Sequence, residues 1–232
     1  MKRIGLIIPS SNRMVEQEMV RVLPAGVTAH VARLRMTGQF ERPIEELLPA
    51  VADAAATLND ARCDAIAFHC TANSTSEGND GEQRLLAAMA GATSVPVTTT
   101  ATAIRAALDI LSLRSFGLVT PYSQAVTEHE AVYFTDAGYR VAALTALGLA
   151  GSDAYCAAPP SLWEETLLAG GRADADGYLL SCANISCFPV IERAEEGLKK
   201  PLVTSNQSVL WALLRAAQAP RPQRLGALMG VP

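Results

Sequence analysis

Two cysteines stand at matching positions of an internal repeat and are the strongest candidates for chemistry in this sequence. Cys70 ends the segment 64–70 (DAIAFHC), and Cys182 ends the segment 176–182 (DGYLLSC), 112 residues further along (182 − 70). A thiol at the start of a helix faces backbone N–H groups, which lower its pKa and make the thiolate available as a nucleophile or base. The pair therefore predicts covalent or acid-base catalysis. The alternative is that both cysteines are packed as small apolar side chains.

The repeat extends beyond the two cysteine segments. Residues 4–9 (IGLIIP) and 116–121 (FGLVTP) share the 112-residue offset, and residues 96–99 (PVTT) and 201–204 (PLVT) follow at an offset of 105 (201 − 96). The smaller second offset indicates a shorter connection in the second half. Because repeats determine architecture, we expect two similar lobes. We assign residues 1–98 and 206–232 to an N-terminal lobe and residues 99–205 to a C-terminal lobe.

Short apolar runs alternate with Ala- and Leu-rich stretches of helical spacing along the whole chain. The predicted strands are 4–8, 27–31, 65–68, 95–97, 116–119, 140–144, 178–180 and 201–203, and the predicted helices are 45–59, 83–89, 102–111, 127–136, 161–169 and 209–218. Continuously apolar strands are typical of a parallel sheet covered on both faces. The predicted fold is α/β, with two pseudo-symmetric doubly wound lobes. Each lobe has a four-stranded parallel sheet flanked by helices, and the active site lies between the lobes. Residues 219–232, with three prolines, are expected to form a loose terminal extension.

Small polar residues follow most of the predicted strands, where ligands of open α/β sheets bind. Backbone N–H groups at helix starts, together with hydroxyl and amide donors, can hold a carboxylate without Lys or Arg. Tyr122 can hydrogen-bond a carboxylate or a developing enolate, unless it only packs. Asn12 and Asn206 can each bind a carboxylate or simply cap a helix. The candidate binding residues are Ser11, Asn12, Thr71, Ala72, Tyr122, Ala183 and Asn206. His69 is adjacent to Cys70 in a strand and faces the other way, so we interpret it as structural.

Composition and charge argue against several classes of function. Half of the 232 residues are hydrophobic, and the formal net charge of −4 gives no basic surface for nucleic acid. Without a long apolar segment or a signal peptide, we expect a cytoplasmic protein with no membrane association. Five cysteines, an odd number, indicate free thiols, and the scattered histidines argue against zinc. Nucleotide-binding glycine motifs and a G-x-S-x-G elbow are missing from the sequence, so we predict no cofactor.

Taken in order, the motifs resemble those of one protein superfamily. The segments are IGLIIPSSN (4–12), HCTANSTSEG (69–78), GLVTPY (117–122), LLSCANI (179–185) and PLVTSNQSVLW (201–211). Together they resemble the Asp/Glu racemase superfamily, and within it the branch of maleate cis-trans isomerases and arylmalonate decarboxylases. The resemblance covers about residues 3 to 215.

The resemblance implies a cofactor-independent homo-oligomeric enzyme that acts on a small dicarboxylate between its lobes. In maleate isomerases the first cysteine, here Cys70, attacks the double bond, and the second, here Cys182, handles the proton. Tyr122 and Asn12 then hold the carboxylates. The covalent adduct has a single C–C bond that rotates, and elimination yields fumarate.

Two related activities and one different class stay open as alternatives. Arylmalonate decarboxylases resemble this chain but have glycine at the first cysteine position, so Cys70 argues against a decarboxylase of substituted malonates. Amino-acid or hydantoin-type racemases keep both cysteines, although the PSSN and TPY motifs favour the isomerase. The polar loop after Cys70 and the pair Thr127-Glu128 depart from the maleate isomerase pattern and affect substrate identity. A ligand-binding or regulatory module with inert cysteines is the third alternative.

Overall fold

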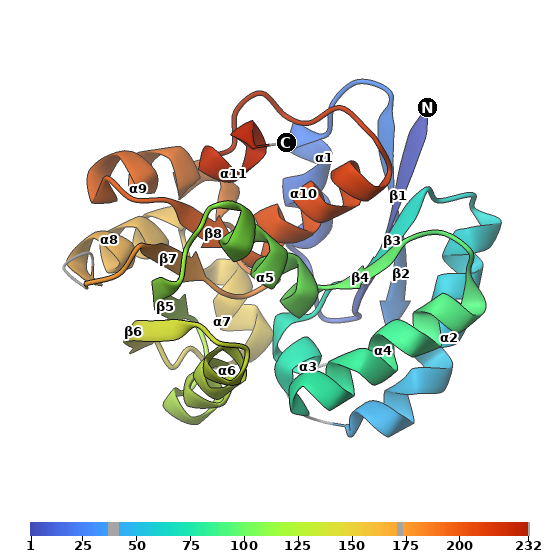
Figure 1. The fold of residues 1–232 in the computed structure, drawn as a ribbon, viewed down its shortest axis with the longest axis horizontal. Coiled ribbons are helices and arrows are strands. Elements are labelled where there is room, and N and C mark those ends of the chain that lie inside the picture. Colours follow the sequence, from blue (N-terminus) through green and yellow to red (C-terminus); the bar gives the residue numbers. More distant parts are fainter. Residues whose placement is uncertain (37–41, 171–173, 232) are drawn as a thin grey trace.

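The computed structural model describes residues 1–36, 42–170 and 174–231, and it contains two four-stranded parallel sheets with helices around them (Figure 1). The first sheet has the order β2-β1-β3-β4, with β1 at Lys2–Pro9, β2 at Val27–Leu34, β3 at Ala65–Phe68 and β4 at Val97–Thr99. The second has the order β6-β5-β7-β8, with β5 at Ser115–Thr120, β6 at Arg140–Ala146, β7 at Gly177–Leu180 and β8 at Leu202–Thr204. Each predicted strand overlaps an observed one, and the predicted α/β architecture is confirmed.

The helices divide into those that periodicity predicted and short ones that it did not. The predicted helices are α2 (Ile44–Asp60), α4 (Gly78–Ala92), α5 (Thr100–Ile110), α6 (Gln124–Asp136), α8 (Pro160–Gly170) and α10 (Ser205–Ala216). The unpredicted ones are α1 (Val15–Val22), α3 (Thr71–Thr75), α7 (Gly151–Ala157), α9 (Ile191–Leu198) and α11 (Ala227–Gly230), and a 3-10 turn spans Phe188–Val190. A segment of four to eight residues covers about two helical turns at most, which is too little for a 3.6-residue period to be recognised.

The repeat in the sequence is a repeat in local structure. The Asp64 carboxylate accepts the backbone N–H of Arg3 at 2.8 Å, and the Asp176 carboxylate accepts that of Ser115 at 2.8 Å. Asp64 N–H donates back to Arg3 O at 2.7 Å, and Asp176 N–H donates to Ser115 O at 2.9 Å. In each lobe one Asp therefore joins the first residues of the central strand to the strand that carries the cysteine.

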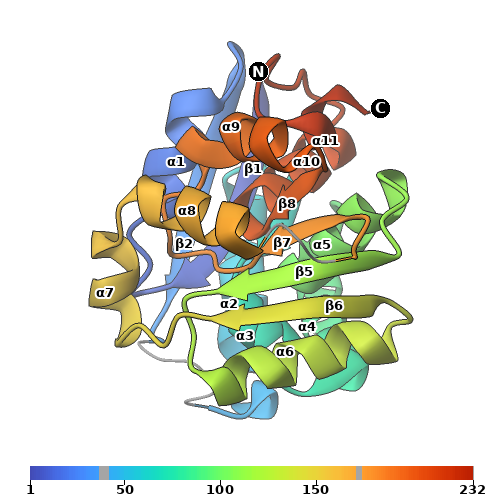
Figure 2. The same ribbon diagram turned by 90° about the vertical axis from the view of Figure 1, so that its left-hand side faces the viewer.

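Helices α5 and α10 occupy equivalent positions at the ends of the two halves and pack against each other between the sheets. Each contacts both terminal strands, β4 and β8. The same arrangement is visible in Figure 1, where α5 and α10 lie between the two groups of strands. In the second lobe, α8 and α9 lie near β7 and β8, and α6 lies along β6 (Figure 2). The two sheets are thus held in a fixed relation, with the carboxyl ends of their central strands near one another.

The predicted loose extension at the C-terminus is wrong for residues 225–230, whereas residues 219–224 form neither a helix nor a strand. Leu225, Leu228 and Met229 are buried, and α11 packs against α10. Gln207 Nε2 donates to Leu225 O at 2.6 Å, which ties this segment to the first turn of α10. The prolines pointed to a loop, but the apolar residues after them bury against the helices. Pro232 lies outside the described residues. No helix in the described part of the chain combines the length and apolar character that crossing a membrane requires.

Candidate active site

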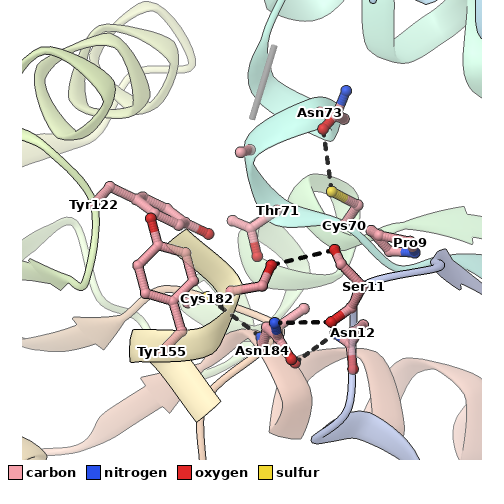
Figure 3. A pocket seen from close by; sticks show the side chains of 13 residues that line it. Pro9, Ser11, Asn12, Cys70, Thr71, Asn73, Tyr122, Tyr155, Cys182 and Asn184 are labelled. Atoms are coloured by element: carbon pink, nitrogen blue, oxygen red, sulfur yellow. Dashed lines mark hydrogen bonds between the residues drawn. The ribbon is translucent and has the colours of Figure 1, made fainter. Parts of the chain in front are cut away.

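A pocket lies between the lobes at the ends of the strands, with about 430 Å³ of space that opens to solvent on one side. It is lined by Pro9, Ser11, Asn12, Cys70, Thr71, Ala72, Asn73, Tyr122, Ser152, Tyr155, Cys182, Ala183 and Asn184 (Figure 3). The structure therefore brings eight of the nine predicted site residues to one place. Asn206 is the exception. The catalytic and binding roles of these residues stay predictions.

Cys70 reaches the pocket from the end of β3. Its backbone is extended (φ −148°, ψ 108°), and it directly precedes α3, whose five residues are all buried. The half-buried thiol donates to Asn73 Oδ1 at 3.3 Å, as the dashed line in Figure 3 shows. This contact holds the sulfur beside the first turn of α3.

Cys182 reaches the same pocket from the end of β7 but has different surroundings. It is only 3% exposed, and its sulfur accepts the backbone N–H of Asn184 at 3.3 Å. The Tyr122 hydroxyl is a neighbour of this thiol and acts to lower its pKa. Residues 183–184 form a turn and residues 185–187 are not helical, so this cysteine does not begin a helix as Cys70 does.

The expectation of low-pKa thiols is wrong for the structure as it stands. Burial raises the pKa of the Cys70 thiol to about 11, and the Asn73 N–H offsets this only in part. Burial raises the pKa of Cys182 to about 12, although Tyr122 and the Asn184 N–H act to lower it. Loss of water around a thiolate therefore outweighs one or two hydrogen-bond donors. At Cys70, α3 is too short to add a large dipole. At neutral pH both thiols carry their protons.

Tyr122 and Tyr155 form an aromatic wall of the pocket. Their ring centroids are 5.8 Å apart with an interplanar angle of 71°, an edge-to-face contact that Figure 3 also shows. Burial raises the pKa of Tyr122 well above its usual value, with the neighbouring Cys182 and Glu130 adding to the rise. Tyr122 is therefore a hydrogen-bond donor at all ordinary pH values.

Helix α7 contributes two lining residues that sequence reasoning missed, Ser152 and Tyr155. Ser152 Oγ donates to Ser11 Oγ at 3.2 Å, and an ion pair of 2.6 Å between Arg13 and Asp153 lies nearby. These contacts tie the loop after β1 to α7 of the other lobe. The signal was weak, because seven residues without clear periodicity do not identify a helix or its inward face.

Asn12 lines the pocket and also joins the lobes. Its Nδ2 donates to Ala183 O at 2.9 Å, while its Oδ1 accepts the N–H groups of Met14 and Val15, both at 3.1 Å. Asn12 therefore fixes the start of α1 and holds the turn after Cys182. Asn12 thus holds the backbone at the start of α1, as the capping alternative expected, and also lines the pocket, while carboxylate binding by Asn12 stays a prediction.

Asn184 was also missed and serves as a second link between the lobes. Its Oδ1 accepts the N–H of Arg13 at 2.9 Å and the Cys156 thiol at 3.1 Å. Two further lining residues outside the predicted set, Pro9 and Asn73, lie beside predicted ones in the PSSN and HCTANSTSEG motifs. Proximity in sequence to Ser11 and Cys70 was the signal that could have identified them.

The structure places Asn206 away from the pocket, and a direct contact with substrate is not supported. Asn206 is fully buried, with its Oδ1 3.0 Å from His69 Nε2 and its Nδ2 donating to Glu18 at 3.1 Å. Burial lowers the pKa of His69 to about 4, so this ring is neutral. His69 therefore donates from Nε2 to Asn206 and accepts from Thr100 at Nδ1, 3.0 Å away. The asparagine and the histidine together form a structural link between β3 and α10.

A pocket lined by one cysteine from each of two pseudo-symmetric lobes defines a two-lobed α/β protein with a paired-thiol site. Among the described residues, no group of three or more His, Cys, Asp and Glu side chains is placed to hold a metal ion. The chain matches the model of the arylmalonate decarboxylase family over residues 4–229 and belongs to that family.

Individual relatives carry two different activities in their names. A maleate isomerase from Pseudomonas putida is 28% identical over 228 residues, covering 92% of this chain and 91% of the relative. A double variant of arylmalonate decarboxylase, glycine to cysteine and cysteine to serine, superposes with a TM-score of 0.90 at 24% identity over 99% of both chains. A maleate cis-trans isomerase from Nocardia farcinica has a TM-score of 0.86 at 24% identity, covering 98% of each chain. That structure is a cysteine-to-serine variant with a covalently bound succinylcysteine intermediate.

Proposed function

We propose that this protein is a cofactor-independent cis-trans isomerase that converts maleate, or a closely related small unsaturated dicarboxylate, to the trans isomer. The observation that carries the proposal is the second thiol: Cys70 faces the same pocket as Cys182. One thiol is enough to deliver a proton, whereas addition to a double bond with proton transfer needs a nucleophile and an acid. The names of the relatives and the succinylcysteine in the Nocardia protein support the same chemistry.

The pocket suits a small dianion although Lys and Arg are not among its lining residues. Asn12, Thr71 and Tyr122 offer polar side-chain groups, and the backbone N–H groups at the start of α3 offer further donors. Hydrogen bonds to a carboxylate are stronger than bonds between neutral groups, and more so where water is excluded. We infer that these groups hold the two carboxylates.

The two thiols divide the reaction between them. The Cys70 thiolate forms a C–S bond to one alkene carbon, and the electron pair of the double bond takes the proton of Cys182 at the neighbouring carbon. The product is a succinyl thioether on Cys70 and a thiolate on Cys182. After rotation about the new single bond, Cys182 takes the proton back, the C–S bond breaks, and the Cys70 thiolate leaves the trans alkene. Atoms and charge balance over the cycle.

The cycle begins only after Cys70 has lost its proton. Because burial raises the pKa of Cys70 to about 11, the thiolate fraction is small at pH 7 and increases as the pH rises. We therefore expect kcat to increase with pH across the neutral range.

Proton NMR of the protein with maleate in deuterated water tests the proposal. Fumarate should appear with wild-type protein, and Cys70→Ala or Cys182→Ala should abolish it. A panel of substituted malonates and amino acids in the same assay reveals the competing activities by decarboxylation or α-deuteration. Full activity in either alanine variant, or turnover of the panel without turnover of maleate, would contradict the proposal.

A racemase remains the second candidate, because two thiols in one pocket can also serve as acid and base on opposite faces of one carbon. The α-deuteration arm of the same assay identifies it. The proposal also includes a cytoplasmic location, as expected from the sequence pattern, and a homo-oligomer, as the family resemblance implies. Light scattering during gel filtration tests the oligomeric state.

A further inference from the structure

A buried carboxyl group that the proposed reaction does not use lies behind the pocket. Glu130, on α6, is 1% exposed, and its Oε1 contacts Ser181 Oγ in a short hydrogen bond. Its Oε2 is buried without a hydrogen-bond partner among the described residues. Burying an ionised carboxylate oxygen without a hydrogen-bond partner costs much free energy. Burying the carbonyl oxygen of a protonated carboxyl group without a partner costs much less.

Three hydroxyl groups connect this carboxyl group to the pocket. Ser181 Oγ lies 3.4 Å from Ser205 Oγ, which in turn lies 3.0 Å from Thr71 Oγ1. Ser181 and Ser205 are fully buried, and Thr71 is 1% exposed and lines the pocket. A hydroxyl group has one proton and can rotate, so each member can donate in either direction along the chain.

The charge state of Glu130 changes within the range of ordinary assays. Burial raises the pKa of Glu130 to about 8, and the hydrogen bond from Ser181 offsets this only in part. The titratable groups that interact with it are Tyr122 and Cys182. Helix α3, which packs against α6, has no ionisable residue, and β6 has only the exposed Arg140. Cys70 and Cys182 have pKa values of about 11 and 12, so neither of the two pocket thiols accounts for a transition near pH 8.

We propose that Glu130 sets the direction of the hydroxyl chain and thereby decides whether Thr71 offers the pocket a proton or a lone pair. With Glu130 ionised, Thr71 donates to Ser205, Ser205 to Ser181 and Ser181 to the carboxylate, so the Thr71 oxygen presents only lone pairs to the pocket. With Glu130 protonated on Oε1, every bond reverses, and the Thr71 hydroxyl donates into the pocket. Only the second state favours a substrate carboxylate. Glu130 is thus a positioning residue, and this inference rests on the proposed dicarboxylate substrate.

The pseudo-symmetric counterpart of Glu130 shows that burial alone does not produce this arrangement. Glu18 precedes Glu130 by 112 residues (130 − 18) and is also buried. Its two oxygens accept four hydrogen bonds, from Ser186 Oγ, Cys187 Sγ, Phe188 N and Asn206 Nδ2. Glu18 therefore serves as a saturated internal anchor, and it is the matched control.

The main experiment compares the pH dependence of dicarboxylate binding in wild type, Glu130→Gln and Glu18→Gln. The probes are maleate for KM and succinate, which has no double bond to react, for calorimetric binding between pH 7 and 9.5. In wild type, KM and the succinate Kd should increase by about tenfold or more above pH 8, because the hydrogen bond from the Thr71 hydroxyl to the carboxylate of the bound ligand is lost. Binding at pH 8.5 should also take up about 0.5 to 0.8 of a proton, because about three-quarters of Glu130 is ionised there in the free protein; the uptake is seen as a dependence of the heat on buffer ionisation.

The two variants separate positioning from a structural effect. In Glu130→Gln the amide N–H₂ imitates the protonated carboxyl group, so KM should stay at its low-pH value up to pH 9.5, and proton uptake should disappear. Glu18→Gln, measured where circular dichroism shows it folded, should keep the wild-type pH profile. Persistence of the wild-type profile in Glu130→Gln, or a pH-independent KM in wild type, would overturn the inference.

Infrared spectroscopy makes the inference testable even if maleate is not the substrate. At pH 7 the wild-type spectrum should contain the band of a protonated carboxylic acid, and this band should disappear with a midpoint near pH 8. The Glu130→Gln spectrum should not contain it. Glu130 already ionised at pH 7 would overturn the inference. Failure of wild type to bind or convert maleate at any pH would contradict the proposed function instead, and the infrared band would still decide the state of Glu130.

Discussion

The two lobes have the same backbone frame but differ in what surrounds their cysteines. Asp64 and Asp176 each accept a backbone N–H at the start of the central strand, and each cysteine lies two residues beyond the end of the neighbouring strand. Cys70, however, is half-buried and precedes a helix, whereas Cys182 is 3% exposed and is contacted by Tyr122. The repeat thus fixes where the thiols lie, and the side chains around them decide what each can do.

The same divergence separates the two equivalent glutamates. Among the residues that the structure describes, Glu18 accepts four hydrogen bonds, whereas Glu130 has one partner and an unpaired oxygen. One carboxyl group is satisfied as an anchor, and the other is left able to change its protonation state. Equivalent positions in a duplicated fold therefore need not keep equivalent roles.

Replacing either thiol by a hydroxyl group should have the largest effect on activity. Cys70→Ser and Cys182→Ser should each lower the isomerisation rate by about 10³-fold or more, because groups that act as a unit in covalent catalysis fail together. With maleate, Cys182→Ser should accumulate an adduct on Cys70, visible as one added substrate mass in intact-protein mass spectrometry, because solvent can supply the proton slowly but the thiolate that takes it back is missing. An adduct on Cys182 in the Cys70→Ser variant would reverse the assigned roles.

The reactivity of the free thiols tests the contrast in burial. Alkylation of Cys70 by iodoacetamide should accelerate about tenfold per pH unit between pH 7 and 10, because the thiolate fraction rises in this way below a pKa near 11. Cys182, more buried and with a pKa of about 12, should be labelled more slowly at every pH. Peptide mass spectrometry measures both sites, with the half-buried Cys156 as a reference. Rapid labelling of Cys70 at pH 7 would instead reveal a low-pKa thiolate.

The smallest expected difference is in stability, between the two glutamates. Glu18→Gln should lower the free energy of unfolding by about 2 kcal/mol, because an amide N–H₂ group meets buried donors that the carboxylate accepted. Glu130→Gln should be neutral at pH 4 and more stable than wild type at pH 9. The folded-state pKa of Glu130 is raised to about 8, so its ionisation in the unfolded state opposes folding increasingly from about pH 4.5 to 8. Urea unfolding at both pH values measures these effects, and equal losses in the two variants would show that the glutamates are equivalent.

Local pattern was enough to predict the frame of this protein. Short continuously apolar runs, a fixed offset between repeats and helical spacing each depend on residues near one another in sequence. In the described part of the chain they identified the eight strands and the six longer helices, and the rule for strand ends placed Cys70, Cys182 and six other residues in one pocket. The short helices were missed because they span too few residues to show a period.

The sequence by itself determined the architecture and the pairing of the thiols, because both follow from periodicity and repetition. Only the tertiary structure decided which polar groups the pocket includes. Asn206 lies outside the pocket, where it hydrogen-bonds His69 and Glu18, and Tyr155 of the C-terminal lobe lines the pocket although its sequence gave no sign of this. It also raised the pKa of both thiols and of Glu130, because desolvation sums over neighbours that are distant in sequence. A pattern of residues near one another in sequence therefore cannot predict these pKa shifts.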